Sequence, residues 1–196
     1  MVQHGIQIQP RSALILHGWH GSGPAHWQTW LAGELAHLGW TVQYPHLPDS
    51  DHPTLAAWLD AAWAQVQQHR PQTVICHSLA CLLWMHLVAR HSDVHCETLL
   101  LVAPSSPARR LLEVRDFFPV PEIDLSRHAT TRLIVISTND PYCPLPDAKE
   151  LETLWNAPIQ VLDQAGHINV DAGYGPWPWA KDWLLSSESP DDDKKT

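Results

Sequence analysis

The sequence has few cationic residues and no block of them. Lys and Arg together number 12, against 21 Asp and Glu, and the formal net charge is −9. Nucleic acids and anionic membranes bind proteins through clusters of positive charge. The composition therefore argues against both kinds of partner.

Long apolar segments are also missing. The chain has no apolar run of about 18 residues, the length that a membrane-spanning helix needs. The N-terminal sequence MVQHGIQIQPRS lacks the charged and apolar regions of a secretory signal peptide. We therefore predict a cytoplasmic protein. Cysteine is scarce, and in a chain of this size without a secretory signal we expect these thiols to be reduced. The cysteines are Cys76, Cys81, Cys96 and Cys143.

Short apolar runs alternate with helical patterns along the chain. Successive runs begin about 25 to 35 residues apart, and several are apolar on consecutive positions, as in a parallel sheet covered on both faces. The runs are ALILHG (13–18), WTVQYP (40–45), TVICHS (73–78), TLLLVAP (98–104), RLIVIST (132–138) and IQVLDQ (159–164). Between the second and third runs, residues 53–66 carry apolar side chains at helical spacing, with Pro53 near the first helical position. This alternation predicts an α/β fold.

The length and the composition of two segments predict how the chain is organised. A chain of 196 residues suits one domain, which we place at residues 1–185. The polar segment 186–196 has no apolar anchor, and we expect it to be a disordered tail. Segment 104–130 carries four prolines and only a short helical pattern near 108–116, so we expect a small partial cover over the site.

The stretch VICHSLACLLW (74–84) has the shape of the G-x-S-x-G nucleophile elbow, but neither glycine is present. Cys76 and Ala80 occupy the two positions that must be small because a strand and a helix pass close together there. Ser78 would then project its hydroxyl from a strained turn. The alternative is an ordinary serine that caps a buried helix, and this stretch alone leaves both interpretations open.

Two further residues complete a candidate triad. Asp140 follows the fifth apolar run, and His167 follows the sixth in a glycine-containing loop. The order Ser78, Asp140, His167 is the one that α/β-hydrolases use, and each residue lies just past the end of a predicted strand. Asp163 is a rival acid, but it precedes the histidine by four residues, which makes the triad geometry harder. Asp171 follows the histidine and breaks the order.

The loop after the first run, HGWHGSGPAHWQTWL (17–31), is rich in glycine and histidine. We expect it to supply an oxyanion-hole N–H near Gly18 or Trp19, beside the N–H of Leu79 at the start of the helix after the elbow. A phosphate-binding loop is disfavoured because no lysine follows these glycines. A metal site is disfavoured because the histidines have no recognised ligand spacing. The histidines concerned are His17, His20 and His26.

Several residues near the predicted site are candidates for substrate binding. Trp19 lies in the predicted oxyanion loop, His77 adjoins Ser78, and Trp177 follows the loop of His167. Indole rings are large apolar surfaces that suit an acyl pocket. Most of the other tryptophans are expected to fill the core.

Four strings together resemble the small serine hydrolases related to retinoblastoma-binding protein 9. They are LHGWHGSGPAHWQTWL, CHSLACLL, STNDPYCP and AGHINVDAGYGPWP, and the likeness spans about residues 12–184. It implies a three-layer α/β-hydrolase fold with a six-stranded, mostly parallel sheet in the order 2-1-3-4-5-6 and little or no cap. It also implies a triad of Ser78, Asp140 and His167. Family members commonly have glycine where this chain has Ala80.

These observations predict a serine esterase that cleaves small acyl esters through an acyl-enzyme. No cofactor or metal is expected, and the oligomeric state is expected to be a monomer or a weak homodimer. Two alternatives stay open: a binding or scaffold protein that keeps the fold with little turnover, and an acyltransferase that uses the same triad with another acceptor.

Overall fold

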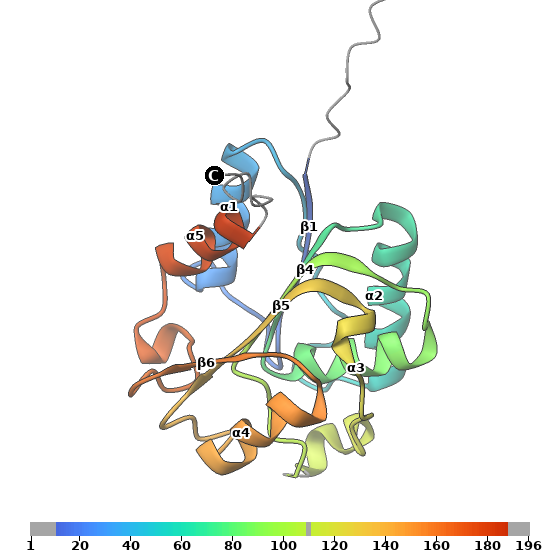
Figure 1. Cartoon of the computed structure of the whole chain (residues 1–196), viewed down its shortest axis with the longest axis vertical. Helices are drawn as coiled ribbons and strands as arrows, with labels where there is room; N and C mark the ends of the chain where they lie inside the picture. Colours follow the sequence, from blue (N-terminus) through green and yellow to red (C-terminus); the bar gives the residue numbers. More distant parts are fainter. Residues whose placement is uncertain (1–10, 109–110, 188–196) are drawn as a thin grey trace, which may run out of the picture.

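A six-stranded parallel sheet forms the centre of the protein (Figure 1). The computed structural model describes residues 11–108 and 111–187, and the strands lie in the order β2-β1-β3-β4-β5-β6. Their bounds are Ser12–Leu16 (β1), Thr41–Gln43 (β2), Thr73–His77 (β3), Cys96–Val102 (β4), Ala129–Ser137 (β5) and Ile159–Leu162 (β6). Each pair of neighbouring strands is parallel, so the predicted fold class and strand order are confirmed.

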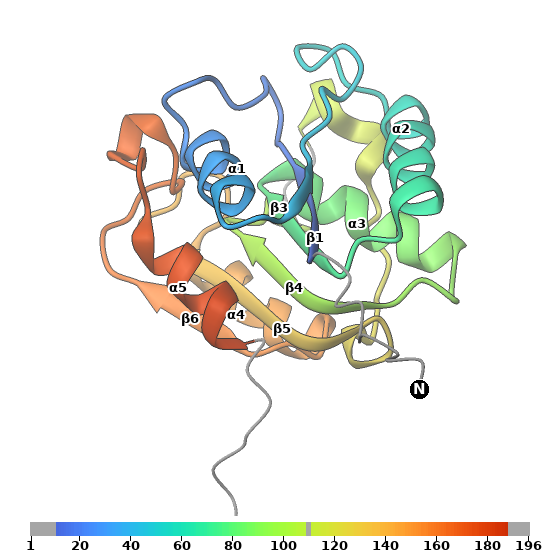
Figure 2. The same cartoon turned by 90° about the horizontal axis from the view of Figure 1, so that it is seen from above.

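Helices cover both faces of the sheet, as Figure 2 shows for α1 and α5 on one side and α2 and α3 on the other. The helices are Trp27–His37 (α1), Leu55–His69 (α2), Leu79–Arg90 (α3), Leu145–Leu154 (α4) and Pro178–Ser187 (α5). Successive side chains of β1 alternate between the two layers. Ala13 and Ile15 pack in the cluster of α1 and α5, whereas Leu14 and Leu16 pack in that of α2, α3 and α4. Burial on both faces explains why the strand runs are apolar at consecutive positions.

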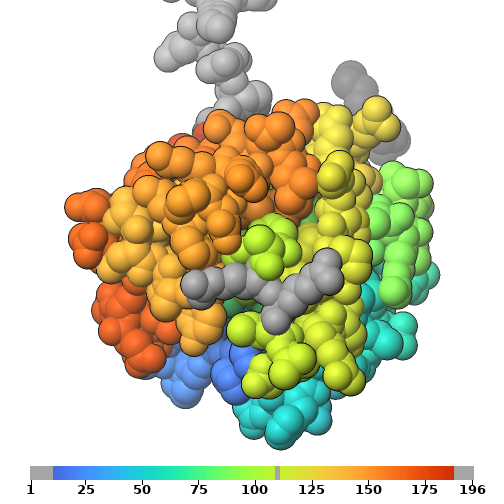
Figure 3. All heavy atoms as spheres, turned by 90° about the horizontal axis from the view of Figure 1, so that it is seen from below, coloured from blue at the N-terminus to red at the C-terminus, as the bar shows by residue number. Residues whose placement is uncertain are grey.

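Segment 104–130 contains two short 3₁₀ helices, η1 (Leu112–Phe117) and η2 (Leu125–Arg127). Val114 and Phe117 of η1 are buried against the cluster of α2 and α3. In the space-filling view, the yellow-green residues of this segment lie across one face, beside the orange residues that contain α4 (Figure 3). The segment connects β4 to β5 outside the sheet.

Two predicted element boundaries are wrong by a short distance. Helix α2 begins at Leu55, and the hydroxyl of Thr54 accepts a bond from the Ala57 N–H, so Pro53 precedes the cap. Helix α5 includes Ser186 and Ser187, which the sequence analysis assigned to a disordered tail. The rest of that tail, residues 188–196, lies outside the described residues. Within the described ranges, none of the helices has the length and apolar character to cross a membrane.

Arg70 ends α2 in the left-handed conformation, with φ 45° and ψ 61°. This conformation costs a residue with a Cβ about 1 kcal/mol, and glycine relieves the cost. We expect Arg70→Gly to raise the free energy of unfolding by about that amount in urea titrations. Arg90→Gly, at the exposed right-handed end of α3, is the matched control and should lower it. A loss of stability in Arg70→Gly would contradict this account.

Candidate active site

Ser78 lies in a strained turn between β3 and α3. Its φ of 56° and ψ of −123° fall where residues with a side chain are rare. The Ser78 N–H donates to the carbonyl of Val102 at 2.9 Å, which ties the turn to the end of β4. Cys76 and Ala80 on either side are completely buried. Ser78 occupies the N-cap position of α3, but its side chain makes no capping bond, so the interpretation as an ordinary helix cap is wrong.

The structure brings the three predicted triad side chains together. Ser78 Oγ lies 2.8 Å from His167 Nε2, and His167 Nδ1 lies 2.9 and 3.0 Å from the two carboxylate oxygens of Asp140. A carboxylate can only accept, so Nδ1 carries the proton and donates to Asp140. Nε2 is then free to accept the hydroxyl proton of Ser78. Both side chains of the His167–Asp140 pair are largely buried, with exposed fractions of 10% and 2%.

The loops that carry Asp140 and His167 are bonded to each other. Asn139 Oδ1 accepts from the Gly166 N–H at 2.7 Å, and the Ser137 hydroxyl accepts from the Ala165 N–H at 3.0 Å. The rival acid Asp163 belongs to the same network, because its carboxylate accepts from the Thr138 hydroxyl at 2.9 Å. Asp163 therefore joins the two loops, whereas the carboxylate that the His167 imidazole binds is that of Asp140.

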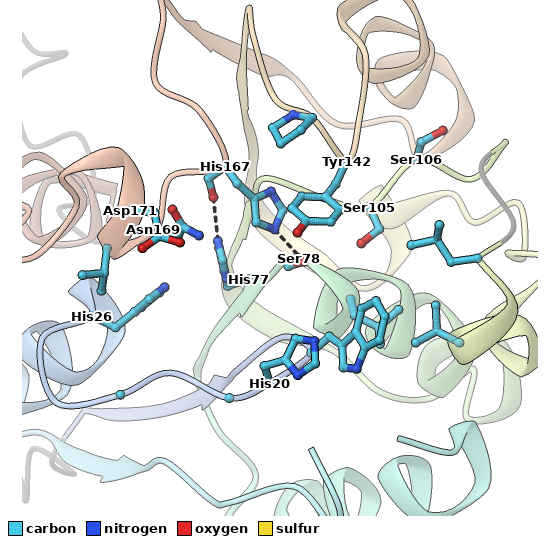
Figure 4. Close-up of a pocket in the computed structure, with 18 of the residues that line it drawn as sticks. His20, His26, His77, Ser78, Ser105, Ser106, Tyr142, His167, Asn169 and Asp171 are labelled. Carbon is cyan, nitrogen blue, oxygen red and sulfur yellow. Dashed lines mark hydrogen bonds between the residues drawn. The ribbon is translucent and has the colours of Figure 1, made fainter. Parts of the chain in front are cut away.

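Two buried side chains hold the His167 loop against the nucleophile, and the sequence analysis missed both roles. His77 Nε2 donates to the carbonyl of His167 at 3.0 Å (Figure 4). Trp27 Nε1 donates to the carbonyl of Ile168 at 2.9 Å. The partners are separated by 90 and 141 residues in sequence, so no local pattern signals these contacts.

The loop after β1 approaches the nucleophile very closely at Gly18. A Cβ added there would lie 2.8 Å from Ser78 Cβ and 3.0 Å from the His77 carbonyl oxygen. Leu79 opens α3, so its N–H lies in the first turn, where a helix offers no acceptor. Among the described residues of the loop, the N–H groups of His20 and Gly21 already donate to carbonyls. Gly18 and Leu79, two of the residues predicted to supply oxyanion-hole donors, thus border Ser78.

His17 and Gln28 fix the start of this loop. His17 Nδ1 donates to the Gly18 carbonyl at 2.8 Å, and its Nε2 accepts from the Leu47 N–H at 2.9 Å. Gln28 Nε2 donates to the Leu16 carbonyl at 3.0 Å. Both ring nitrogens of His17 are therefore in use, which excludes it as a metal ligand. Over residues 11–108 and 111–187, no group of three His, Cys, Asp or Glu residues could hold a metal ion.

A cavity of about 440 Å³ opens beside Ser78. Trp19 and His77, the candidates for substrate binding, line it together with residues that were not candidates, among them Phe118 and Tyr142. Trp177 does not line it. This indole is buried between Trp27 and Trp179, with ring centroids 5.2 Å away on each side, because the chain turns inward after the His167 loop. The assignment of Trp177 to substrate binding is wrong.

Burial keeps several histidines near the site neutral. Desolvation, with a smaller contribution from the His167 imidazole, lowers the pKa of His77 well below its usual value and the pKa of His26 to about 4. His17, also desolvated, has a lowered pKa. These rings therefore act near neutral pH as uncharged hydrogen-bonding groups.

Comparison with known proteins places this geometry among hydrolases. A family model described as "Serine hydrolase" matches residues 13–186. A protein named YdeN from Bacillus subtilis (strain 168) is 25% identical over 182 residues, covering 90% of this chain and 95% of YdeN. The crystal structure of the ydeN gene product from B. subtilis superposes with a TM-score of 0.80 at 24% identity, covering 92% of this chain and 100% of that one.

A more distant structure has the same fold. The esterase domain of a protein from Rhodothermus marinus superposes with a TM-score of 0.64 at 16% identity. The match covers 86% of this chain and 83% of that domain. At this level of identity, the likeness supports the fold alone.

Gly18→Ala tests the close approach at the nucleophile. The added methyl group would displace Ser78, and a misplacement of about 1 Å costs roughly 100-fold in reactivity. We expect the second-order rate of labelling by a fluorophosphonate probe to fall by about that factor. Gly33→Ala in α1 is the matched control, because a Cβ there meets no atom within 4 Å. Equal labelling rates in the two variants would contradict the steric argument.

His26 should make stability depend on pH. Its pKa falls from 6.5 in the unfolded chain to about 4 in the folded one, so between these values only the unfolded chain binds the proton. The free energy of unfolding therefore decreases as the pH falls through this window, by about 1 kcal/mol per pH unit from this ring. Urea titrations at about pH 6 and pH 5 should show a shallower slope for His26→Asn, which keeps a capping acceptor. His52→Asn, at an exposed position, is the control, and a wild-type slope in His26→Asn would refute the assignment.

Proposed function

Because this chain belongs to the serine hydrolase family, we propose that it is an esterase that cleaves small acyl esters through Ser78, His167 and Asp140. The observation that carries the proposal is the continuous hydrogen-bonded chain from the Ser78 hydroxyl through the imidazole to a buried carboxylate. The Rhodothermus marinus domain shares the fold, and its description as an esterase domain is the precedent for proposing an ester as the bond that is cleaved. The uncharged His77 and His26 rings place no permanent positive charge beside this chain of groups.

In the first half of the reaction, His167 Nε2 takes the proton of Ser78 as Oγ attacks the ester carbonyl. Asp140 holds the Nδ1–H tautomer and stabilises the imidazolium that forms. The C–O bond to the alcohol then breaks, and the departing oxygen receives the proton from Nε2. Water repeats the sequence on the acyl-enzyme and releases the acid.

The negative charge that develops on the carbonyl oxygen requires donors close to Ser78. The Leu79 N–H and an N–H from Gly18 or Trp19 are the proposed pair. Each preorganised donor of this kind contributes on the order of 10²–10³ in rate. Bonds from Gln28 and His17 to the β1 end and Gly18 keep the loop in place before substrate arrives.

Within the family, we further propose a relationship to the hydrolases of the retinoblastoma-binding protein 9 type. The strings HSLAC, NDPYC and AGHIN, which carry the three triad residues, support it. A small-molecule acyl ester remains the proposed partner, and a cytoplasmic monomer or weak homodimer the proposed state.

Ser78→Ala should abolish turnover. Loss of the nucleophile in a triad enzyme costs on the order of 10⁶ in kcat. We expect no detectable hydrolysis of 4-nitrophenyl butanoate and no labelling by a fluorophosphonate probe, with circular dichroism unchanged. Ser186→Ala, on the exposed side of α5, is the matched control and should hydrolyse and label like the wild type. A folded wild type with no hydrolysis above buffer, or a Ser78→Ala variant that still labels, would overturn the proposal.

A further inference from the structure

The cavity beside Ser78 has two chemically different halves. Figure 4 shows His26, Asn169 and Asp171 on one side of Ser78, and Ser105 and Tyr142 on the other. Three apolar residues that line the cavity belong, like Ser105, to the segment between β4 and β5. They are Leu111, Val114 and Phe118. On the side of His26, Val170 lines the cavity between Asn169 and Asp171, so this half combines one apolar side chain with polar groups, and the two halves suit different parts of a substrate.

Two side chains of the polar half present hydrogen-bond donors. His26 Nδ1 accepts from the Gln28 N–H at 3.2 Å, so the proton of this neutral ring is on Nε2. Asn169 Oδ1 accepts from the Ala172 N–H at 3.1 Å, which leaves the Asn169 amide NH₂ to donate. His26 is only 5% exposed, and its ring centroid lies 5.0 Å from that of His77. The capping bonds of His26 and Asn169 thus fix which of their atoms remain available to donate in the cavity.

Asp171 adds an acceptor at the edge of the same half. It lines the cavity from η3 (Val170–Ala172), two residues beyond Asn169, and is exposed to solvent. Burial lowers the pKa of His26 to about 4, so His26 offers no compensating positive charge near neutral pH. Neutral donors beside a carboxylate acceptor fit hydroxyl groups, which both donate and accept. The same set disfavours an anionic group, which Asp171 would repel.

The chemistry of ester cleavage assigns this half to the alcohol. The departing oxygen must receive its proton from His167 Nε2, so the alcohol lies on the imidazole side of the scissile carbon. Asn169 and Asp171 follow His167 in the same loop, and His26 adjoins His77, which is bonded to the His167 carbonyl. The apolar half, across Ser78, is left for the acyl chain.

We propose that His26, Asn169 and Asp171 form a leaving-group subsite for an uncharged alcohol with several hydroxyl groups, as in glycerol or sugar esters. This assignment rests on the proposed esterase function and names its substrate class. In the acylation step, Ser78 Oγ bonds to the acyl carbon and the bond from that carbon to the polyol oxygen breaks. The polyol leaves with the proton that His167 took from Ser78, while its remaining hydroxyls stay bonded to the subsite.

The test compares two esters with the same acyl group. The kcat/KM ratio of 2,3-dihydroxypropyl butanoate to ethyl butanoate is measured for the wild type, His26→Asn, Asn169→Ser and Asp171→Asn. Asparagine and serine keep an acceptor for the two caps, but each is shorter than the side chain that it replaces, so its own donor reaches less far into the cavity. Asp60→Asn, exposed on α2, is the matched control for charge removal. The intrinsic reactivity of the two esters cancels when the ratio is compared between proteins.

We expect each subsite variant to lower this ratio roughly three- to tenfold, the effect of one net hydrogen bond, while Asp60→Asn keeps the wild-type ratio. Wild-type ratios in all three subsite variants, with both esters hydrolysed, would overturn the subsite and leave the esterase proposal standing. Hydrolysis of neither ester by the folded wild type would overturn both. A lower ratio in Asp60→Asn equal to that in Asp171→Asn would also refute the subsite, because the effect would then be one of net charge.

Discussion

The close approach of three backbones at Ser78 is the constraint on which the site depends. The end of β3, the first turn of α3 and the loop after β1 converge there, and the serine accepts a positive φ because all three hold it. Burial of Cys76 and Ala80 fixes the strand and the helix, and the bond from the Ser78 N–H to the Val102 carbonyl fixes the turn. On the third side, Gly18 has no Cβ, so its backbone can approach Ser78 closely. Such strain persists only where the surroundings over-determine the conformation. As a result, the Ser78 hydroxyl is directed at His167 and lies close to Gly18.

The loops of the site are held by neutral, buried side chains, and two of their hydrogen bonds span 90 and 141 residues of sequence. His17 and Gln28 hold the loop of Gly18, while His77 and Trp27 hold the loop of His167. Each of these bonds uses a main-chain carbonyl as acceptor, so each restrains backbone position. Burial disfavours the charged form of the imidazoles. An uncharged second ring can thus lie close to His167 without repelling the imidazolium that catalysis requires.

Much of this arrangement could be predicted from sequence because its signals are local or ordered. The consecutive apolar positions of β1, β3 and β4 reflect burial on both faces. The order of Ser78, Asp140 and His167 after β3, β5 and β6 remains recognisable although both elbow glycines are missing. The supporting bonds could not be predicted, because Trp27 reaches Ile168 across 141 residues and only tertiary packing creates that contact. Trp177 was wrongly assigned to substrate binding because the assignment relied on proximity in sequence. It is near His167 in sequence, but the chain turns and buries its indole against Trp27.

The hydrogen bonds between the Asn139 and Gly166 loops bear on how such chains can recombine. Because Ser137, Thr138 and Asn139 bind the segment just before His167, the acid and the base form one preassembled cassette. A chimaera with crossover points before Ser137 and after His167 transfers that cassette whole into a related scaffold. A crossover between α4 and β6 takes the two loops from different parents, so the hydrogen bonds between them must form between residues of different origin. This cassette meets the rest of the site through the bond from His167 to Ser78 and through the bonds that His77 and Trp27 donate to the His167 loop, so a new scaffold must supply these partners as well.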